Sequence, residues 1–294
     1  RSSNRQAVVG RRQRTSLSVS AHANMVLSTA STAHTRVRPE YDRFADIYSI
    51  WTDTAASTRA NLPFYVDTCV AADSPVVELG VGDGRIAVEV AKRGVQVTGI
   101  DASPAMLRLC RARAERAGVG EQVRTFEADF RDFTLAEPAS LITLPYHSLG
   151  HLTGLDDKQS AMRQIFSQLR PGGQFIFDDF LVTPLLLAHM RQVQLRALYR
   201  SPEGRDALLW VTSLVDESSQ SLTVVTWEDL LDDEGRLASR QYRQLSLSWL
   251  QPAQTRQLLT DAGFEIDACY GNFEQAPFDS TTAQEQVWIA RKPS

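Results

Sequence analysis

Residues 76–85 constrain the fold of this chain more than any other segment. They read Val-Val-Glu-Leu-Gly-Val-Gly-Asp-Gly-Arg, with glycines at alternate positions 80, 82 and 84, and an amphipathic stretch follows. The pattern predicts a strand, a tight turn and a helix start, where glycine and free N–H groups let the backbone approach a ligand closely. The turn is typical of nucleotide binding. It matches the dinucleotide fingerprint poorly, because Arg85 stands where that pattern has its third glycine and Glu78 where an apolar residue is usual.

Strand-like runs alternate with helix signals along most of the chain. Ser103-Pro104 is a helix N-cap followed by proline, and 162–169 carries an apolar stripe at helical spacing ahead of Pro171-Gly172-Gly173. The predicted strands are 76–80, 95–100, 122–127, 139–145 and 174–179. Such alternation predicts a parallel sheet covered on both faces, with ligands at the carboxyl ends of its strands.

Acidic residues follow the second and third predicted strands. Asp101 lies about 20 residues beyond the glycine turn, the interval at which a carboxylate binds ribose hydroxyls in such folds. Asp129 precedes Phe130 at the next strand end. An acid there can bind an adenine amino group while the aromatic ring packs on the base.

At this point the chain resembles the class I S-adenosylmethionine-dependent methyltransferases, over roughly residues 40–292. The matching segments are VVELGVGDG (76–84), VTGIDASPAML (97–107), EADF (127–130), ASLITLPYHSLGHL (139–152) and LRPGGQFIFDD (169–179). The resemblance implies an α/β fold. Its core would be a Rossmann-like, doubly wound, mostly parallel seven-stranded sheet, completed by two strands between Gly263 and Ile289, with an antiparallel β excursion.

The resemblance also implies S-adenosylmethionine as the cofactor. Glu78 and the glycine turn would hold its methionine end, Asp101 the ribose, and Asp129 with Phe130 the adenine. Arg85 would pair with the cofactor carboxylate, or merely sit in the first helical turn. The expected cofactor-binding residues are Tyr41, Tyr48, Glu78, Gly80, Gly82, Gly84, Arg85, Asp101, Ala102, Met106, Asp129, Phe130 and Leu144.

The methyl acceptor is expected beside Tyr146, His147 and His151, which follow the fourth predicted strand. Methyl transfer from a sulfonium needs mainly proximity, alignment and exclusion of water, and a base only if the acceptor must lose a proton. The two histidines could orient the acceptor or take a proton, and a structural role for each is equally open. No third ligand has suitable spacing, so no metal site is predicted. Asp178 and Asp179, at the end of the fifth strand, could hold a cationic amine or simply be solvated.

The acceptor itself is predicted to be a small molecule. Nitrogen is preferred over oxygen through resemblance to glycine and amino-sugar N-methyltransferases. The alternatives are an O-methyltransferase of a small metabolite, a protein or RNA methyltransferase, and a non-catalytic cofactor-binding interaction protein. Leu144-Pro145-Tyr146 lacks the Asp or Asn and the second proline of enzymes that methylate nucleic-acid amino groups. With a net charge of −4, no nucleic-acid partner is expected.

Two segments of the predicted methyltransferase domain, 40–294, would cover the site. Period-two alternation around a turn at 232–235 predicts the antiparallel excursion over 206–249, which could roof the acceptor pocket, form a dimer surface or simply pack. Residues 40–72 would form N-terminal lid helices. There Tyr41, Phe44, Tyr48 and Trp51 lie at helical spacing, with Tyr41 and Tyr48 over the cofactor, although plain packing is the alternative.

Residues 1–39 differ from the rest of the chain, with seven arginines, many Ser and Thr, and no acid before Glu40. We expect a disordered basic leader, resembling a transit peptide, or a non-native extension if Met25 is the true start. Three widely spaced cysteines without a CxxC motif indicate free thiols, and no apolar run reaches about 18 residues. The prediction is a cytoplasmic monomer or homodimer without a membrane span, or an organellar protein if residues 1–24 are a transit peptide.

Overall fold

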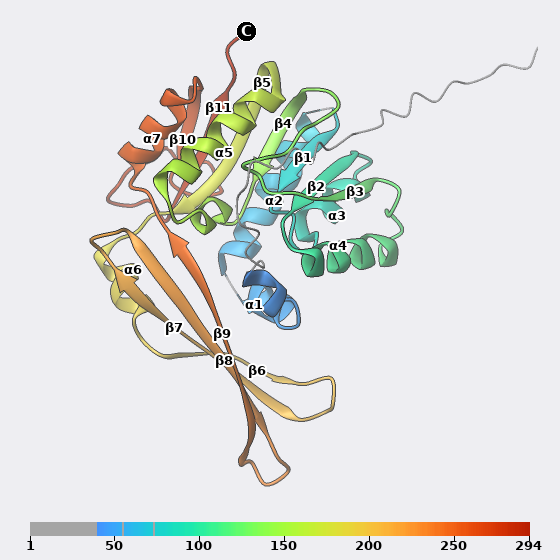
Figure 1. Ribbon diagram of the computed structural model, residues 1–294, viewed down its shortest axis with the longest axis vertical. Coiled ribbons are helices and arrows are strands. Elements are labelled where there is room, and N and C mark those ends of the chain that lie inside the picture. Colours follow the sequence, from blue (N-terminus) through green and yellow to red (C-terminus); the bar gives the residue numbers. More distant parts are fainter. Residues whose placement is uncertain (1–39, 55, 73) are drawn as a thin grey trace, which may run out of the picture.

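The computed structural model describes residues 40–54, 56–72 and 74–294. The expectations for residues 1–39 lie outside these ranges. The described chain contains a seven-stranded sheet flanked by helices and a separate four-stranded antiparallel sheet that extends away from it (Figure 1). The N-terminal helical segment lies beside both.

The larger sheet has the order β10-β11-β5-β4-β1-β2-β3. Strand β11 is antiparallel to both of its neighbours, while β5, β4, β1, β2 and β3 pair in parallel. This confirms the predicted mostly parallel, seven-stranded, Rossmann-like sheet. The strands are β1 (Val76–Leu79), β2 (Val97–Asp101), β3 (Val123–Glu127), β4 (Ala139–Leu144), β5 (Leu169–Phe180), β10 (Glu265–Tyr270) and β11 (Glu285–Arg291).

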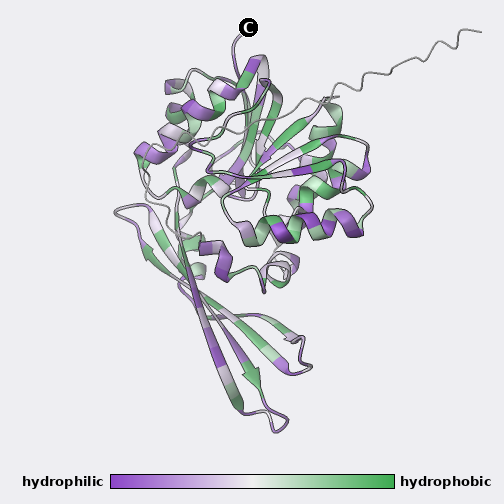
Figure 2. Ribbon diagram, turned by 45° about the vertical axis from the view of Figure 1, so that its right-hand side comes forward, coloured by the Kyte–Doolittle hydropathy of each residue, from purple (hydrophilic) through white to green (hydrophobic). Residues whose placement is uncertain are grey.

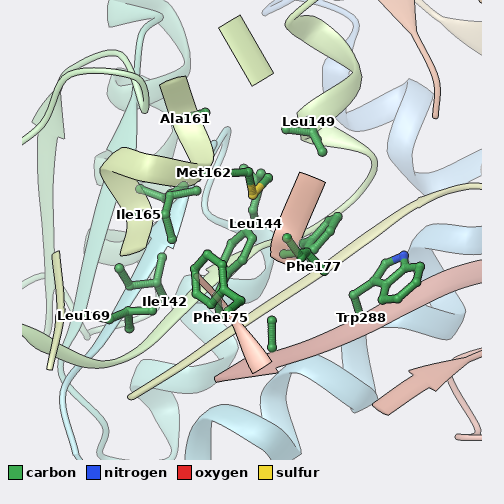
Figure 3. Close-up of a cluster of buried hydrophobic side chains, with 14 of the residues drawn as sticks. Ile142, Leu144, Leu149, Ala161, Met162, Ile165, Leu169, Phe175, Phe177 and Trp288 are labelled. Carbon is green, nitrogen blue, oxygen red and sulfur yellow. The ribbon is translucent and has the colours of Figure 1, made fainter. Parts of the chain in front are cut away.

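Helices bury apolar side chains on both faces of this sheet. On one face, α5 and α7 pack against the strands around Phe175, Phe177 and Trp288 (Figure 3). On the other face lie α2, α3 and α4, and this cluster includes Cys69 and Cys110. The helices are α2 (Ala56–Ala71), α3 (Arg85–Lys92), α4 (Pro104–Arg116), α5 (Leu155–Gln168) and α7 (Pro252–Asp261). No helix in the described ranges is both long and apolar enough to traverse a bilayer.

The start of α4 follows from its sequence. The Ser103 hydroxyl accepts a hydrogen bond from the Met106 amide at 3.2 Å, and Pro104 occupies the first helical position. Proline there has the helical φ angle already and lacks an N–H that would have no partner. The cap places Ala102, Ser103 and Met106 at the carboxyl end of β2.

The second sheet follows α6 (Pro184–Met190) and has the order β6-β7-β8-β9. Hydrophobic and hydrophilic segments alternate along its strands in Figure 2. It begins at Gln194, ahead of the expected boundary at 206, because β6 pairs with β7. A shift in register between Leu195 and Ala197 breaks the period-two pattern in β6, which hid this strand from sequence reasoning. The strands are β6 (Gln194–Arg200), β7 (Asp206–Asp216), β8 (Ser221–Leu231) and β9 (Leu237–Ser248).

The N-terminal segment forms two short helices, η1 (Glu40–Arg43) and α1 (Tyr48–Thr54), ahead of α2. Arg243 of β9 donates to the Arg43 carbonyl at 2.8 Å and pairs with Asp46 at 2.5 Å. The Asp42 carboxylate accepts from the Ser103 hydroxyl at 2.6 Å. The segment is therefore fastened to the second sheet on one side and to the start of α4 on the other.

Candidate functional site

A cavity of about 450 Å³ lies at the carboxyl ends of β1, β2 and β3. Its walls also include η1, α1 and the turn after β4. The volume is within the range of small-molecule and cofactor pockets. It brings together nine of the residues expected to bind the cofactor, namely Tyr41, Tyr48, Gly80, Gly82, Asp101, Ala102, Met106, Asp129 and Phe130.

The glycine turn leaves room for a ligand. Gly80 and Gly82 have φ angles of +62° and +55°, a region that side chains rarely adopt. A Cβ atom on Gly80 would lie 3.1 Å from the Ser148 hydroxyl oxygen, and one on Gly82 would lie 3.4 Å from the Tyr48 hydroxyl. The turn therefore forms a cradle that any side chain would begin to fill.

Asp101 is held in place by the backbone around it. Its carboxylate accepts from the Gly82 amide at 2.9 Å and from the Ser103 amide at 2.8 Å. Burial raises the pKa of Asp101, and these amides oppose the rise. Each carboxylate oxygen can accept a further hydrogen bond, so this side chain suits a vicinal diol in the cavity.

The wall around Asp129 contains a pair that sequence reasoning missed. Arg131 binds the Asp129 carboxylate at 2.6 Å and the Asp157 carboxylate at 2.7 Å. Arg131 itself lines the cavity together with Phe130. The acid expected at the adenine is thus already engaged on one side by a guanidinium.

Four of the expected residues, Glu78, Gly84, Arg85 and Leu144, do not line this cavity. Glu78 is buried, and burial raises its pKa to about 8 against the opposing effect of Arg85. Arg85 turns toward α2, donating to the Thr58 carbonyl at 2.7 Å and to Asn61 at 2.8 Å.

Gly84 and Leu144 lie against other parts of the protein. A Cβ atom on Gly84 would lie 2.6 Å from the Cys110 sulfur, so this glycine lets α3 and α4 pack closely. Leu144 is fully buried in the sheet.

A second cavity of about 370 Å³ adjoins the first and shares Tyr41, Tyr146 and His151 with it. It lies between the end of the larger sheet and the inner face of the second sheet. The side chains that the second sheet contributes are mostly apolar: Val211, Leu222, Val224, Leu245 and Leu247. Polar groups also face this cavity, including His147, Arg196 and Glu285.

The turn after β4 has an unusual backbone. Tyr146 and His147 have φ angles of +61° and +56°, which are strained for residues other than glycine. Asp178 supports them, accepting from their two amides at 3.0 and 3.1 Å and from the Tyr65 hydroxyl at 2.5 Å. Asp178 is fully buried and outside both cavities, so its carboxylate positions the turn that presents Tyr146 and His147.

The two histidines carry different charges at neutral pH. Burial disfavours the charged form of His147. Two carboxylates outweigh this effect and raise the pKa of His147 to about 9: Glu285, which lies 2.8 Å from its Nε2, and Asp178. For His151, burial and the positive charges of Lys158 and His147 lower the pKa to about 4. His147 is therefore a cation paired with Glu285, and His151 is neutral.

The His147–Glu285 pair should make the free energy of unfolding fall as the pH becomes alkaline. Because the folded pKa of His147 exceeds its ordinary value of 6.5, its contribution is complete below pH 6.5 and is lost as pH rises through about 9. The shift corresponds to at most about 3 kcal/mol. The free energies of unfolding of the wild type and of His147→Gln, measured in urea across this range, should converge as pH rises. Glu285→Gln should behave like His147→Gln. A gap between wild type and variant that does not change with pH would contradict this assignment.

Residues 76–173 match the methyltransferase domain family. The cypemycin N-terminal methyltransferase of a Streptomyces species is 24% identical over 218 residues, covering 74% of this chain and 83% of that protein. The CcbJ methyltransferase from Streptomyces caelestis is 25% identical, with a TM-score of 0.70 over 87% of this chain and 99% of that one. The sugar N-methyltransferase KedS8 from Streptoalloteichus shares the fold at 16% identity, with a TM-score of 0.65 over 92% and 99% of the two chains.

The fold and these comparisons define a methyltransferase with a Rossmann-like fold. The chain is a class I S-adenosylmethionine-dependent methyltransferase. Within the described residues, no group of three or more His, Cys, Asp or Glu side chains is arranged to hold a metal ion.

Proposed function

We propose that this enzyme transfers a methyl group from S-adenosylmethionine to the nitrogen of a small-molecule amine. The observation that carries the proposal is the pair of adjoining cavities with Tyr41, Tyr146 and His151 as their shared wall. One cavity has the glycine cradle and Asp101, which suit a nucleoside. The other is compact and largely apolar, which suits a small acceptor.

When bound, S-adenosylmethionine supplies a methyl group on a positively charged sulfur, which is already an activated leaving group. The protein's contribution is therefore to align the acceptor and exclude water. Gly80, Gly82 and Asp101 would hold the cofactor. Tyr41 packs edge-on against His151, with ring centroids 4.9 Å apart, so these two rings line the boundary at which the two cavities meet.

The charge states of the histidines favour nitrogen over oxygen. A hydroxyl acceptor would need a base to take its proton during transfer. With a pKa of about 4, His151 is too weak a base for this, and His147 is already protonated and paired with Glu285. A neutral amine already has the lone pair it needs. His151 would then orient the amine by a hydrogen bond, and the amine nitrogen would lose its proton to solvent.

One relative that aligns over 74% of this chain points the same way, whereas the relatives named as O-methyltransferases align over 51% or less. The cypemycin N-terminal methyltransferase acts, by its name, on an N-terminus, which is an amine. Its alignment spans most of both chains. This supports nitrogen as the acceptor atom here.

The proposal is tested in two stages. Purified protein is first titrated with S-adenosylmethionine and S-adenosylhomocysteine by calorimetry, with micromolar dissociation constants expected. Methyl transfer is then measured by mass spectrometry on small amines and on the alcohols of matching shape. Methylation of amines alone supports the proposal. Exclusive methylation of alcohols would replace it with O-methyl transfer, and cofactor binding without transfer to either set would indicate a binding protein.

His151→Ala should lower turnover of the amine more than cofactor affinity. We expect a loss of roughly 10- to 100-fold in kcat/KM, because the variant removes one orienting group at the junction. The pH profile should keep its shape, since the pKa of His151 lies near 4, well below the range in which an amine titrates. Measuring kcat/KM from pH 6 to 9 for both proteins checks this. A profile that changes shape in the variant would instead make His151 the proton acceptor.

A further inference from the structure

The second cavity, which the proposed function assigns to the methyl acceptor and which is called the acceptor cavity below, contains a guanidinium with no anionic partner among the described residues. Arg196, from β6, lines this cavity, and it makes no ion pair with any of the residues that the structure describes. Its Nη2 reaches the Trp51 carbonyl at a long 3.4 Å, and its guanidinium lies 5.0 Å from the centre of the Trp51 ring. Its Nε is buried and has no hydrogen-bond partner within the described ranges.

Other charges nearby do not neutralise Arg196. Among the described residues, Glu285 is the only carboxylate that lines the cavity, and it is engaged by protonated His147 at 2.8 Å. Burial lowers the pKa of Arg196, and the like charge of Arg59 lowers it further against an opposing effect of Tyr146. Arginine nevertheless stays charged in proteins. The wall at β6 is therefore cationic, partly shielded from water and open to a ligand.

We propose that the methyl acceptor carries an oxyanion, a carboxylate or a phosphate, that binds Arg196 while its amine lies at the junction with the cofactor cavity. Planar guanidinium groups bind such oxyanions through paired N–H donors. An anion in the cavity would neutralise the partly desolvated charge of Arg196. The inference rests on the proposed function, since it assigns the acceptor to this cavity.

Binding of simple probes tests the inference without any catalysis. In the presence of S-adenosylhomocysteine, 3-phenylpropanoate and the isosteric 3-phenylpropanamide are titrated into the protein, with 2-phenylethyl phosphate as a third probe. We expect the acid to bind at least about tenfold more tightly than the amide, because a charge-assisted pair forms only with the acid. Tighter binding of the phosphate than of the acid would identify phosphorylated acceptors as the class.

Variants within one strand separate the site from general charge effects. Arg196→Gln should remove the preference for the acid, and Arg196→Lys should retain part of it. Arg200→Gln is the matched control, because Arg200 lies on the same strand, is exposed and lines neither cavity. This control should keep the wild-type preference in full.

The outcomes distinguish the subsite from the reaction. Equal binding of acid and amide, no detectable binding of the acid by the wild type, or an unchanged preference in Arg196→Gln would overturn the inference. An acid preference that depends on Arg196, together with no methyl transfer to any amine, would keep the anion subsite and overturn the proposed function. Transfer to neutral amines that is unaffected by Arg196→Gln would keep the proposed function and overturn the anion subsite.

Discussion

Replacing Asp101 with alanine is expected to weaken S-adenosylmethionine binding by about 10- to 100-fold. The substitution removes charge-assisted hydrogen bonds to the ligand, each of which is worth roughly 1.5–3 kcal/mol. It also leaves the Gly82 and Ser103 amides without the acceptor that holds the turn in shape. Calorimetric titration of the wild type and the variant with S-adenosylmethionine measures the effect.

Asp101→Asn is the informative companion. Asparagine retains one oxygen acceptor, so it should support the turn on one side only. The affinity of this variant for S-adenosylmethionine should lie between those of the wild type and Asp101→Ala. Thermal unfolding of both variants separates loss of the ligand contact from loss of the fold. Unchanged affinity in a folded Asp101→Ala protein would remove Asp101 from the cofactor site.

Replacing Asp178 with alanine is expected to lower the free energy of unfolding by roughly 3–5 kcal/mol and to abolish turnover. The variant deprives three donors of their acceptor: the part-buried amide of Tyr146, the buried amide of His147 and the buried hydroxyl of Tyr65. An unsatisfied buried donor costs about 1–3 kcal/mol. The strained turn would then relax and withdraw Tyr146 and His147 from the acceptor cavity.

Tyr65→Phe is the matched control for Asp178. It removes one hydrogen bond to the same carboxylate and leaves both backbone bonds in place, so a loss of only about 1 kcal/mol is expected. Chemical denaturation compares the two variants directly. If Asp178→Ala were no less stable than Tyr65→Phe, the carboxylate would not be what holds the turn.

Local sequence signals predicted the larger sheet and several residues that line the cavity at the carboxyl ends of β1, β2 and β3. Alternating glycines after a β-branched strand allow few backbone paths, and Ser103-Pro104 begins a helix by its own chemistry. Acidic residues at strand ends gather because parallel strands end at one edge. The strand-end pattern placed Asp101 and Asp129 at one edge, and the family resemblance added Gly80 and Gly82; these four residues line one cavity, whereas Glu78 and Asp178, expected at the same edge, are buried outside it.

The details of the acceptor cavity depend on contacts between residues far apart in the chain. Arg196 lies on a strand whose irregular register hid it, and the partner of His147 is Glu285, 138 positions away. Tyr65 meets Asp178 across 113 positions. No local pattern encodes such pairings, because each depends on how separate elements dock.

The sequence by itself thus determined the fold class, the order along the chain of the strands in the larger sheet, and the glycine turn with Asp101. Short-range backbone preferences and the period of the hydrophobic residues specify these features. Only the tertiary structure decided which histidine is charged, which acids are already engaged and that Arg196 lines a cavity without an ion-pair partner among the described residues. Protonation and pairing depend on burial and on the charges within a few ångströms, and folding alone brings these together.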